Sequence, residues 1–148
     1  MMLSEAIRWF VGEWQFIPGQ SKYEMGILPK QARYRIEPAG DGLSFTAEWV
    51  TPADKAYQVT YQSIPDGKPY PYDNPSLADT ISTNLIDPHT LDTAVIKDHI
   101  IVSYARRTLS NDGRLMTVTQ SGFTADGRSF DNLSVYKKAE RQQSSASL

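Results

Sequence analysis

Short stretches in which apolar and polar residues alternate follow one another along most of the chain. The clearest stretches are 32–37, 43–50 and 56–64, where every second side chain is apolar. Such a segment has one face for a core and one face for water, which is typical of a half-buried β-strand. Further candidate strands lie at 12–17, 80–86, 91–97, 100–109, 115–123 and 129–138. About nine strands leave no room for a large helix.

Turns separate these strands, and the dipeptide Asp-Gly occurs in four of them. A tight hairpin needs positive φ, which glycine adopts without steric cost. The pattern therefore indicates an antiparallel meander. Because closure removes exposed strand edges, we expect an all-β, antiparallel up-and-down barrel of about eight to ten strands. A short N-terminal helix, capped by Ser4, precedes the first strand.

Two segments lack the alternation and contain several Pro and Gly residues. The first, 18–31, also holds Tyr23 and Ile27, so we interpret it as a loop or lid. The second, 66–79, is expected to be a rigid loop. The length of 148 residues fits one domain, expected over 1–138, followed by a disordered polar tail at 139–148.

Composition excludes several classes of function. The net charge is −2 without a basic stripe, which argues against nucleic acid as a partner. The chain has no cysteine, and its two histidines, His89 and His99, fall in predicted turns, so we expect no metal site and no cofactor. No segment approaches the roughly 20 apolar residues of a membrane-spanning helix, and we expect no membrane association. The N-terminal residues do not resemble a signal peptide, which favours a cytoplasmic location.

Gly12 and Trp14 lie directly after the predicted helix. They resemble the Gly-x-Trp motif that opens lipocalins and the wider calycin superfamily. In that superfamily the tryptophan closes the barrel floor, and an arginine from a late strand packs over its ring. The resemblance therefore implies a structural role for Trp14. The candidate partners are Arg106, Arg107 and Arg128, and the sequence leaves the choice open.

Much of the chain, about residues 12–138, also looks like a small bacterial lipocalin-like family whose function is uncharacterised. The similarity covers the run 21–23, the GDGL turn, the pattern at 79–81 and the VYKK ending at 135–138. These motifs are turns and strands, so the resemblance implies a calycin fold and no particular chemistry. Many relatives carry export signals, which this sequence lacks.

Aromatic residues gather on the predicted inward faces of three successive strands. Tyrosine contributes apolar area together with a hydroxyl that needs a partner, so several inward tyrosines favour a partly polar cavity over a dry core. We therefore predict a ligand cavity whose lining includes Tyr34, Trp49, Tyr57 and Tyr61. A barrel filled by its own side chains is the alternative.

Arg106 and Arg107 are neighbours on a predicted strand, so one of them faces inward. Apolar residues occur on both alternating sets of this strand, and parity alone leaves the choice open. We favour Arg106, in line with Tyr104. A buried guanidinium needs an anionic partner, supplied by the barrel or by a ligand. In fatty-acid-binding proteins, members of the same superfamily, Arg and Tyr hold a ligand carboxylate, and Tyr136 could supply that hydroxyl here.

These observations predict non-catalytic binding of a small hydrophobic or amphipathic ligand, with Arg106 and Tyr136 as anchors for a carboxylate. No catalytic residue is assigned. Two alternatives stay open. The first is an isomerase or hydrolase in the same cavity, which a buried Asp of raised pKa beside a Tyr would favour. The second is a filled barrel that acts through its surface, for example by homodimerisation.

Overall fold

The computed structural model describes residues 5–72, 78–123 and 126–139. Ser4 and residues 140–148, which carry the predicted cap and most of the predicted tail, lie outside the described residues. Within these ranges the elements are, in chain order, η1 (Glu5–Phe10), β1 (Gly12–Phe16), η2 (Pro18–Gln20), β2 (Lys22–Tyr23), β3 (Gln31–Ala39), β4 (Gly42–Val50), β5 (Ala56–Ser63), β6 (Asp66–Pro71), β7 (Thr80–Asp87), β8 (Thr90–Lys97), β9 (Ile100–Leu109), β10 (Leu115–Phe123) and β11 (Ser129–Lys138). Both η elements are 3-10 helices.

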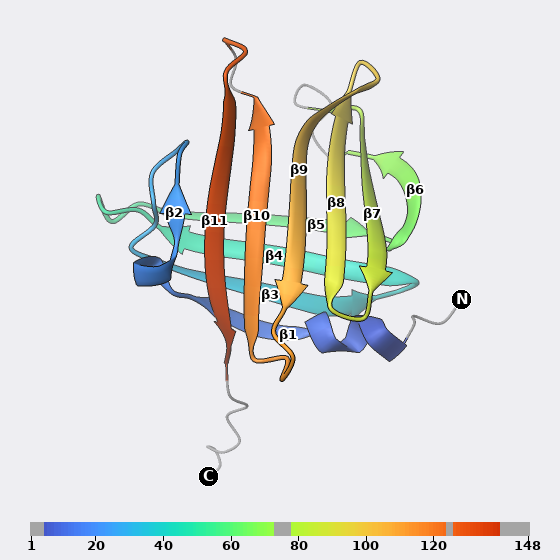
Figure 1. Cartoon of the computed structure of the whole chain (residues 1–148), viewed down its shortest axis with the longest axis horizontal. Coiled ribbons are helices and arrows are strands. Elements are labelled where there is room, and N and C mark those ends of the chain that lie inside the picture. The colour runs from blue at the N-terminus through green and yellow to red at the C-terminus, as the bar shows by residue number, and fades with distance from the viewer. Residues whose placement is uncertain (1–4, 73–77, 124–125, 140–148) are drawn as a thin grey trace.

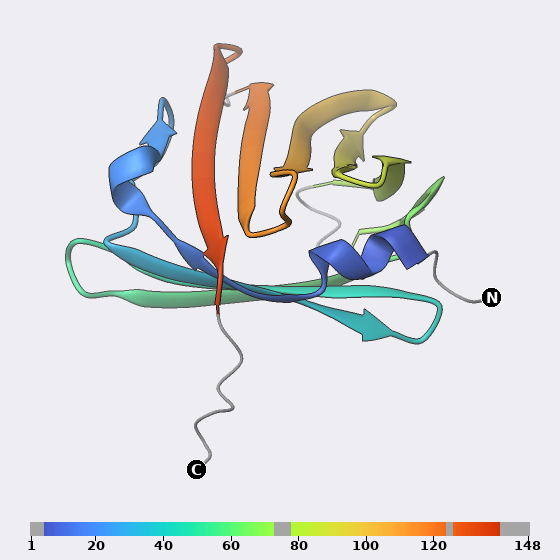
Figure 2. The same cartoon turned by 60° about the horizontal axis from the view of Figure 1, so that its bottom comes forward.

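All strands belong to one antiparallel sheet with the order β5-β4-β3-β1-β11-β10-β9-β8-β7-β6, and β2 pairs with β11. The chain meanders except at β1, which lies between β3 and β11 and so joins the first strands to the last. In Figure 1 the strands β3–β5 run crosswise behind β7–β11. Figure 2 shows the two groups as layers that face each other. The predicted all-β antiparallel barrel is confirmed.

The eleven strands exceed the predicted eight to ten because β2 and β6 form inside the segments predicted as loops. β6 contains Pro69 and Pro71, which lack a backbone N–H. A strand at the end of the sheet can hold proline, since one of its edges needs no hydrogen-bonded partner. The prediction of a rigid loop over 66–79 was therefore wrong for Asp66–Pro71.

The barrel is not fully closed, because the two end strands of the sheet, β5 and β6, are not paired with each other. A side-chain hydrogen bond bridges the gap. The hydroxyl of Ser63, the last residue of β5, donates to Thr83 Oγ1 of β7 over 2.7 Å, and both side chains are buried. The two layers are thus joined at this seam by buried hydroxyls.

Positive φ occurs at three of the four Asp-Gly glycines, as the turn chemistry predicts: Gly67, Gly113 and Gly127. In the first hairpin the positive φ lies at Gly40 (57°), not at Gly42. Gly42 meets a different requirement, because a Cβ there would lie 2.5 Å from the carbonyl oxygen of Ser63. This glycine lets β4 and β5 approach closely at the seam.

One end of the barrel is filled by a hydrophobic core. η1 packs Ile7 and Phe10 into this end, where both side chains are almost completely buried. Trp14 is fully buried beside them, and its indole Nε1 donates to the carbonyl oxygen of Phe10 over 3.0 Å. The remaining buried members of this cluster are Tyr34, Ile36, Leu43, Phe45, Leu91, Leu109 and Met116.

The cation over the Trp14 ring is a lysine. Lys138, near the end of β11, places Nζ 5.2 Å from the ring centroid, a cation–π distance. None of the three arginines considered from the sequence makes this contact among the described residues. Register explains the difference, because Lys138 lies directly opposite Trp14 in the β1–β11 pair.

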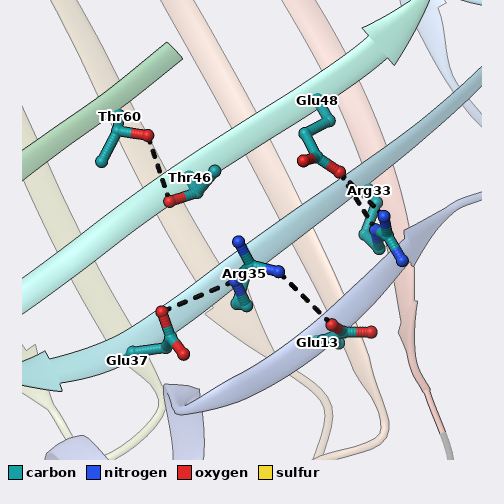
Figure 3. Close-up of polar contacts among 7 residues, drawn as sticks. All are labelled: Glu13, Arg33, Arg35, Glu37, Thr46, Glu48 and Thr60. Carbon is teal, nitrogen blue, oxygen red and sulfur yellow. Dashed lines mark hydrogen bonds and ion pairs between the residues drawn. The ribbon is translucent and has the colours of Figure 1, made fainter. Parts of the chain in front are cut away.

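The outer face of the β1–β3–β4 layer is charged. Figure 3 shows Arg33 beside Glu48, at 2.9 Å, and Arg35 between Glu13 and Glu37, at 3.7 and 3.5 Å. These residues are the polar members of the alternating pattern. Their apolar neighbours on the same strands therefore face the barrel interior.

Candidate ligand-binding cavity

A cavity of about 440 Å³ lies inside the barrel, next to the packed core. Its volume falls at the lower end of the range of roughly 300–1,000 Å³ for ligand pockets. β3, β4 and β5 line one side, and β7 to β11 line the other. The segment after β2 contributes Ile27 and Pro29 at the border. Because Ile27 is 70% exposed, this border is the open side of the cavity.

Four of the predicted cavity residues line this space: Tyr34, Trp49, Tyr61 and Tyr136. Tyr57 does not line it. The Tyr57 side chain is 49% exposed and stacks on Trp49, with ring centroids 5.6 Å apart. It lies near the start of β5, beyond the enclosed part of the barrel. Tyr57 is therefore a neighbour of the cavity wall.

Arg107, not Arg106, is the arginine that faces inward. Arg107 is 4% exposed and lines the cavity. Arg106 points to the outer face, where Nη2 and Nε each lie 2.8 Å from an oxygen of Asp92. The prediction that Arg106 is the interior anchor was wrong. The physical reason is the register of β8 and β9, which places Asp92 directly opposite Arg106 and leaves Leu91 opposite Arg107.

Three hydroxyl groups hold the Arg107 guanidinium. Nε and Nη2 donate to the Tyr34 phenolic oxygen over 3.0 and 2.8 Å. Nη2 also donates to Tyr61 over 2.8 Å, and Nη1 donates to Thr93 Oγ1 over 2.8 Å. The guanidinium carbon lies 4.9 Å from the Phe45 ring centroid. The charge is thus fixed at the floor of the cavity, where the packed core begins.

Among the described residues, no carboxylate pairs with Arg107. The side chains that hydrogen-bond to it are those of Tyr34, Tyr61 and Thr93. Burial acts to lower the pKa of Arg107, but the phenolic oxygens of Tyr34 and Tyr61 outweigh it and the pKa is raised overall. Burial raises the pKa of Tyr34 well above its usual value, even beside the arginine, so this phenol is neutral at physiological pH. The floor of the cavity therefore carries a positive charge to which no described carboxylate is hydrogen-bonded, because the nearby carboxylate of Asp92 is paired with Arg106.

A buried aspartate beside a tyrosine does occur, at Asp92 and Tyr104 on the outer face. Burial acts to raise the pKa of Asp92, but hydrogen bonds from Arg106 and Tyr104 lower it below its usual value. The raised pKa that would favour acid–base catalysis is thus not found at Asp92.

Across the described ranges, no group of three or more His, Asp or Glu side chains is arranged to hold a metal ion. Over the same residues, no helix has the length and hydrophobicity to span a bilayer.

Asn132 of β11 fastens the segment that borders the open side. Its Oδ1 accepts hydrogen bonds from the backbone N–H groups of Glu24 and Met25, over 2.8 and 3.0 Å. Its Nδ2 donates to the Met25 carbonyl oxygen over 2.9 Å. The segment predicted as a loop or lid therefore lies against β11, beside the cavity.

No protein-family model matches the chain, and no curated protein sequence matches it. Solved structures do match. Apo lipid binding protein 8 of Caenorhabditis elegans matches with a TM-score of 0.60 at 13% identity, over 94% of this chain and 100% of that one. As-p18, an extracellular fatty acid binding protein, gives a TM-score of 0.55 at 17% identity, over 94% and 100%. Zebrafish ileal bile acid-binding protein, complexed with cholic acid, gives 0.53 at 15%, over 88% and 99%. At these identities the similarity shows the fold alone, a calycin-like barrel of the kind seen in these three structures.

Proposed function

We propose that this protein binds a small amphipathic carboxylate inside the barrel, without catalysis, and that Arg107 holds the carboxylate. The observation that carries the proposal is the buried guanidinium of Arg107, whose hydrogen-bond partners among the described residues are all hydroxyl groups. A buried, unpaired charge is costly, and an anionic ligand would remove that cost. Proteins with the same fold include a fatty acid binding protein and one complexed with cholic acid, which agrees with this class of ligand.

Arg107 has hydrogen-bonding capacity left for such a ligand. A guanidinium carries five N–H donors, and four of them are used by Tyr34, Tyr61 and Thr93. The fifth, on Nη1, is available to a carboxylate oxygen. Tyr34 and Tyr61 also carry O–H donors of their own. A carboxylate that accepts from Arg107 and from a phenol would form charge-assisted hydrogen bonds.

The position of the charge sets the orientation of the ligand. Arg107 lies next to the packed core, while Ile27 marks the open side. An amphipathic acid would therefore enter with its carboxylate first. Its apolar part would lie among the aliphatic side chains farther out, which include Val95 and Val118. Burial of these surfaces supplies affinity, and Arg107 supplies selectivity for an anion.

The test compares decanoate with decanol, which differ in charge and share the alkyl chain. Each compound displaces a fluorescent fatty-acid analogue from the purified protein, and each affinity is measured for the wild type, Arg107→Gln and Arg106→Gln. We expect the wild type to bind decanoate at least about tenfold more tightly than decanol, as one charge-assisted hydrogen bond predicts. Arg107→Gln should abolish the preference.

Arg106→Gln is the matched control, because it removes the same charge from the adjacent position on the outer face. It should keep the preference for decanoate. Arg107→Lys should restore part of the preference, since it restores the charge without the planar fork. Equal affinity of the wild type for decanoate and decanol, or loss of the preference in both glutamine variants, would overturn the proposal. Circular dichroism verifies that each variant is folded.

A further inference from the structure

A second set of hydroxyls lines the same cavity on its β11 side. The Tyr23 hydroxyl lies 2.9 Å from Ser134 Oγ, and Tyr136 follows Ser134 by two residues on the same face of β11. All three residues line the cavity, and Ser134 is only 8% exposed. Burial raises the pKa of Tyr136 well above its usual value, so its phenol stays neutral. We refer to Tyr23, Ser134 and Tyr136 as the β11 hydroxyl cluster.

The β11 hydroxyl cluster has unused hydrogen-bonding capacity. Three hydroxyls carry three O–H donors, and the hydrogen bond between Tyr23 and Ser134 uses one of them. Two donors and several lone pairs are left for whatever fills the cavity. An alkyl chain cannot satisfy them, and a buried polar group without a partner costs free energy. A ligand with an oxygen at this place would satisfy them.

This cluster stands across the cavity wall from the charge. Arg107, Val118 and Ser134 lie opposite one another in a single row across β9, β10 and β11. Neighbouring strands are roughly 4.8 Å apart, so the Cα atoms of Arg107 and Ser134 are about 10 Å apart. Val118 separates the two polar positions. The rings of Tyr34 and Tyr136 contact each other, with centroids 5.6 Å apart.

The facing wall, on β3 and β4, presents Ala32 and Ala47 together with Tyr34 and Trp49. The alanines offer no hydrogen-bonding side chain, and the Tyr34 hydroxyl already accepts from Arg107. The hydroxyls around Arg107 and the β11 hydroxyl cluster are thus two separate polar places in the cavity.

We propose that the ligand is a hydroxylated or oxo carboxylic acid, whose second oxygen hydrogen-bonds to Ser134 and Tyr136 while its carboxylate lies at Arg107. This proposal rests on the proposed function for the position of the carboxylate, and it adds the chemistry of the ligand's other end. A short apolar stretch, in contact with Val118, separates the two oxygen-bearing groups. Sites built to hydrogen-bond an oxygen discriminate against analogues that lack it.

The experiment measures the affinity of decanoate and of a set of hydroxydecanoates that differ in the position of the hydroxyl. We expect at least one positional isomer to bind about tenfold more tightly than decanoate, the gain from one additional hydrogen bond. Tyr136→Phe and Ser134→Ala should each remove this gain, so that in each variant the preferred isomer binds no more tightly than decanoate does. Tyr136→Phe keeps the ring and its packing, so it is the variant least expected to affect folding.

Ser44→Ala, the same change on the outer face of β4, is the matched control and should leave every affinity unchanged. The proposal is overturned if no isomer binds more tightly than decanoate, or if the gain survives in both Tyr136→Phe and Ser134→Ala. Failure of the proposed function has a different signature, because decanoate itself would then show no preference over decanol and no dependence on Arg107.

Discussion

Arg107 donates two hydrogen bonds to the phenolic oxygen of Tyr34, one from Nε at 3.0 Å and one from Nη2 at 2.8 Å, across 73 residues of sequence. The contact joins β9 to β3, and so it connects the two layers of the barrel across the interior. It places a cation where the packed core ends and the cavity begins. One pair of residues therefore serves both the fold and the candidate site.

Tyr34→Phe should destabilise the protein. The ring and its stacking against Phe45 and Tyr136 stay, but two N–H donors of Arg107 lose their acceptor. Leaving buried, charged donors with poorer partners costs about 1–3 kcal/mol. Urea unfolding of the wild type and the variant measures the difference.

Tyr57→Phe is the control, because the Tyr57 side chain is 49% exposed, and it should change stability by less than about 0.5 kcal/mol. Equal stability of the two variants would contradict the prediction.

Asp92→Asn should reveal a pH-dependent contribution to stability. The pKa of Asp92 is lower in the folded protein than its usual value of about 3.9, because hydrogen bonds from Arg106 and Tyr104 outweigh burial. A lowered folded pKa means that the stabilisation is present above the unfolded pKa and is lost as pH falls through the folded pKa. The free energy of unfolding of the wild type should exceed that of Asp92→Asn by about 1–3 kcal/mol at neutral pH. This difference should shrink below about pH 4.

Denaturant unfolding at a series of pH values measures this difference. Asp54→Asn is a suitable control, because Asp54 pairs with Lys30 on the surface and its side chain is 73% exposed. An exposed pair contributes little, so its variant should track the wild type at every pH. A difference between the wild type and Asp92→Asn that does not change with pH would refute the proposed linkage.

The alternation of residues is enough to predict the β3, β4 and β5 layer. Phe45 and Tyr61 face inward while Glu48 faces water, because only one face of these strands meets the core. A period of two then determines the orientation of every side chain on the strand. The same reasoning places Tyr34 and Tyr61 at the cavity without any knowledge of their contact with Arg107.

The choice between Arg106 and Arg107 requires information that alternation does not contain. Both faces of β9 carry apolar residues, so the pattern within the strand does not decide. The register between strands does decide, because it sets Asp92 opposite Arg106. Thr93 accepts from Arg107 in the interior, so its neighbour Asp92 points to the opposite face, where Arg106 lies. Lys138 over Trp14 is likewise a consequence of register.

Gly42→Ala tests the close approach of β4 and β5 at the seam. A Cβ at this position would lie 2.5 Å from the Ser63 carbonyl oxygen, which is backbone and cannot move aside as a side chain could. The variant should lose about 1–3 kcal/mol of stability, as overpacked sites do. Gly19→Ala is the matched control, because a Cβ added there would meet nothing within 4 Å. Thermal unfolding compares the two, and similar melting temperatures would show that the seam relaxes.

Asn132→Ala should release the segment that borders the cavity. The side-chain oxygen of Asn132 accepts from the backbone N–H groups of Glu24 and Met25, so both amides depend on one side chain for protection from solvent. Hydrogen exchange at these two amides should accelerate about tenfold, as loss of one hydrogen bond predicts.

The amide of Val118, inside the β9–β10–β11 ladder, serves as the internal control, and its exchange rate should not change. Asn132→Asp keeps the acceptor but loses the donor to the Met25 carbonyl, so it should retain most of the protection. Unchanged exchange at Glu24 and Met25 in Asn132→Ala would mean that the other contacts with β11 hold the segment, namely the short pairing of β2 and the hydrogen bond from the Asp131 N–H to Glu24 Oε1.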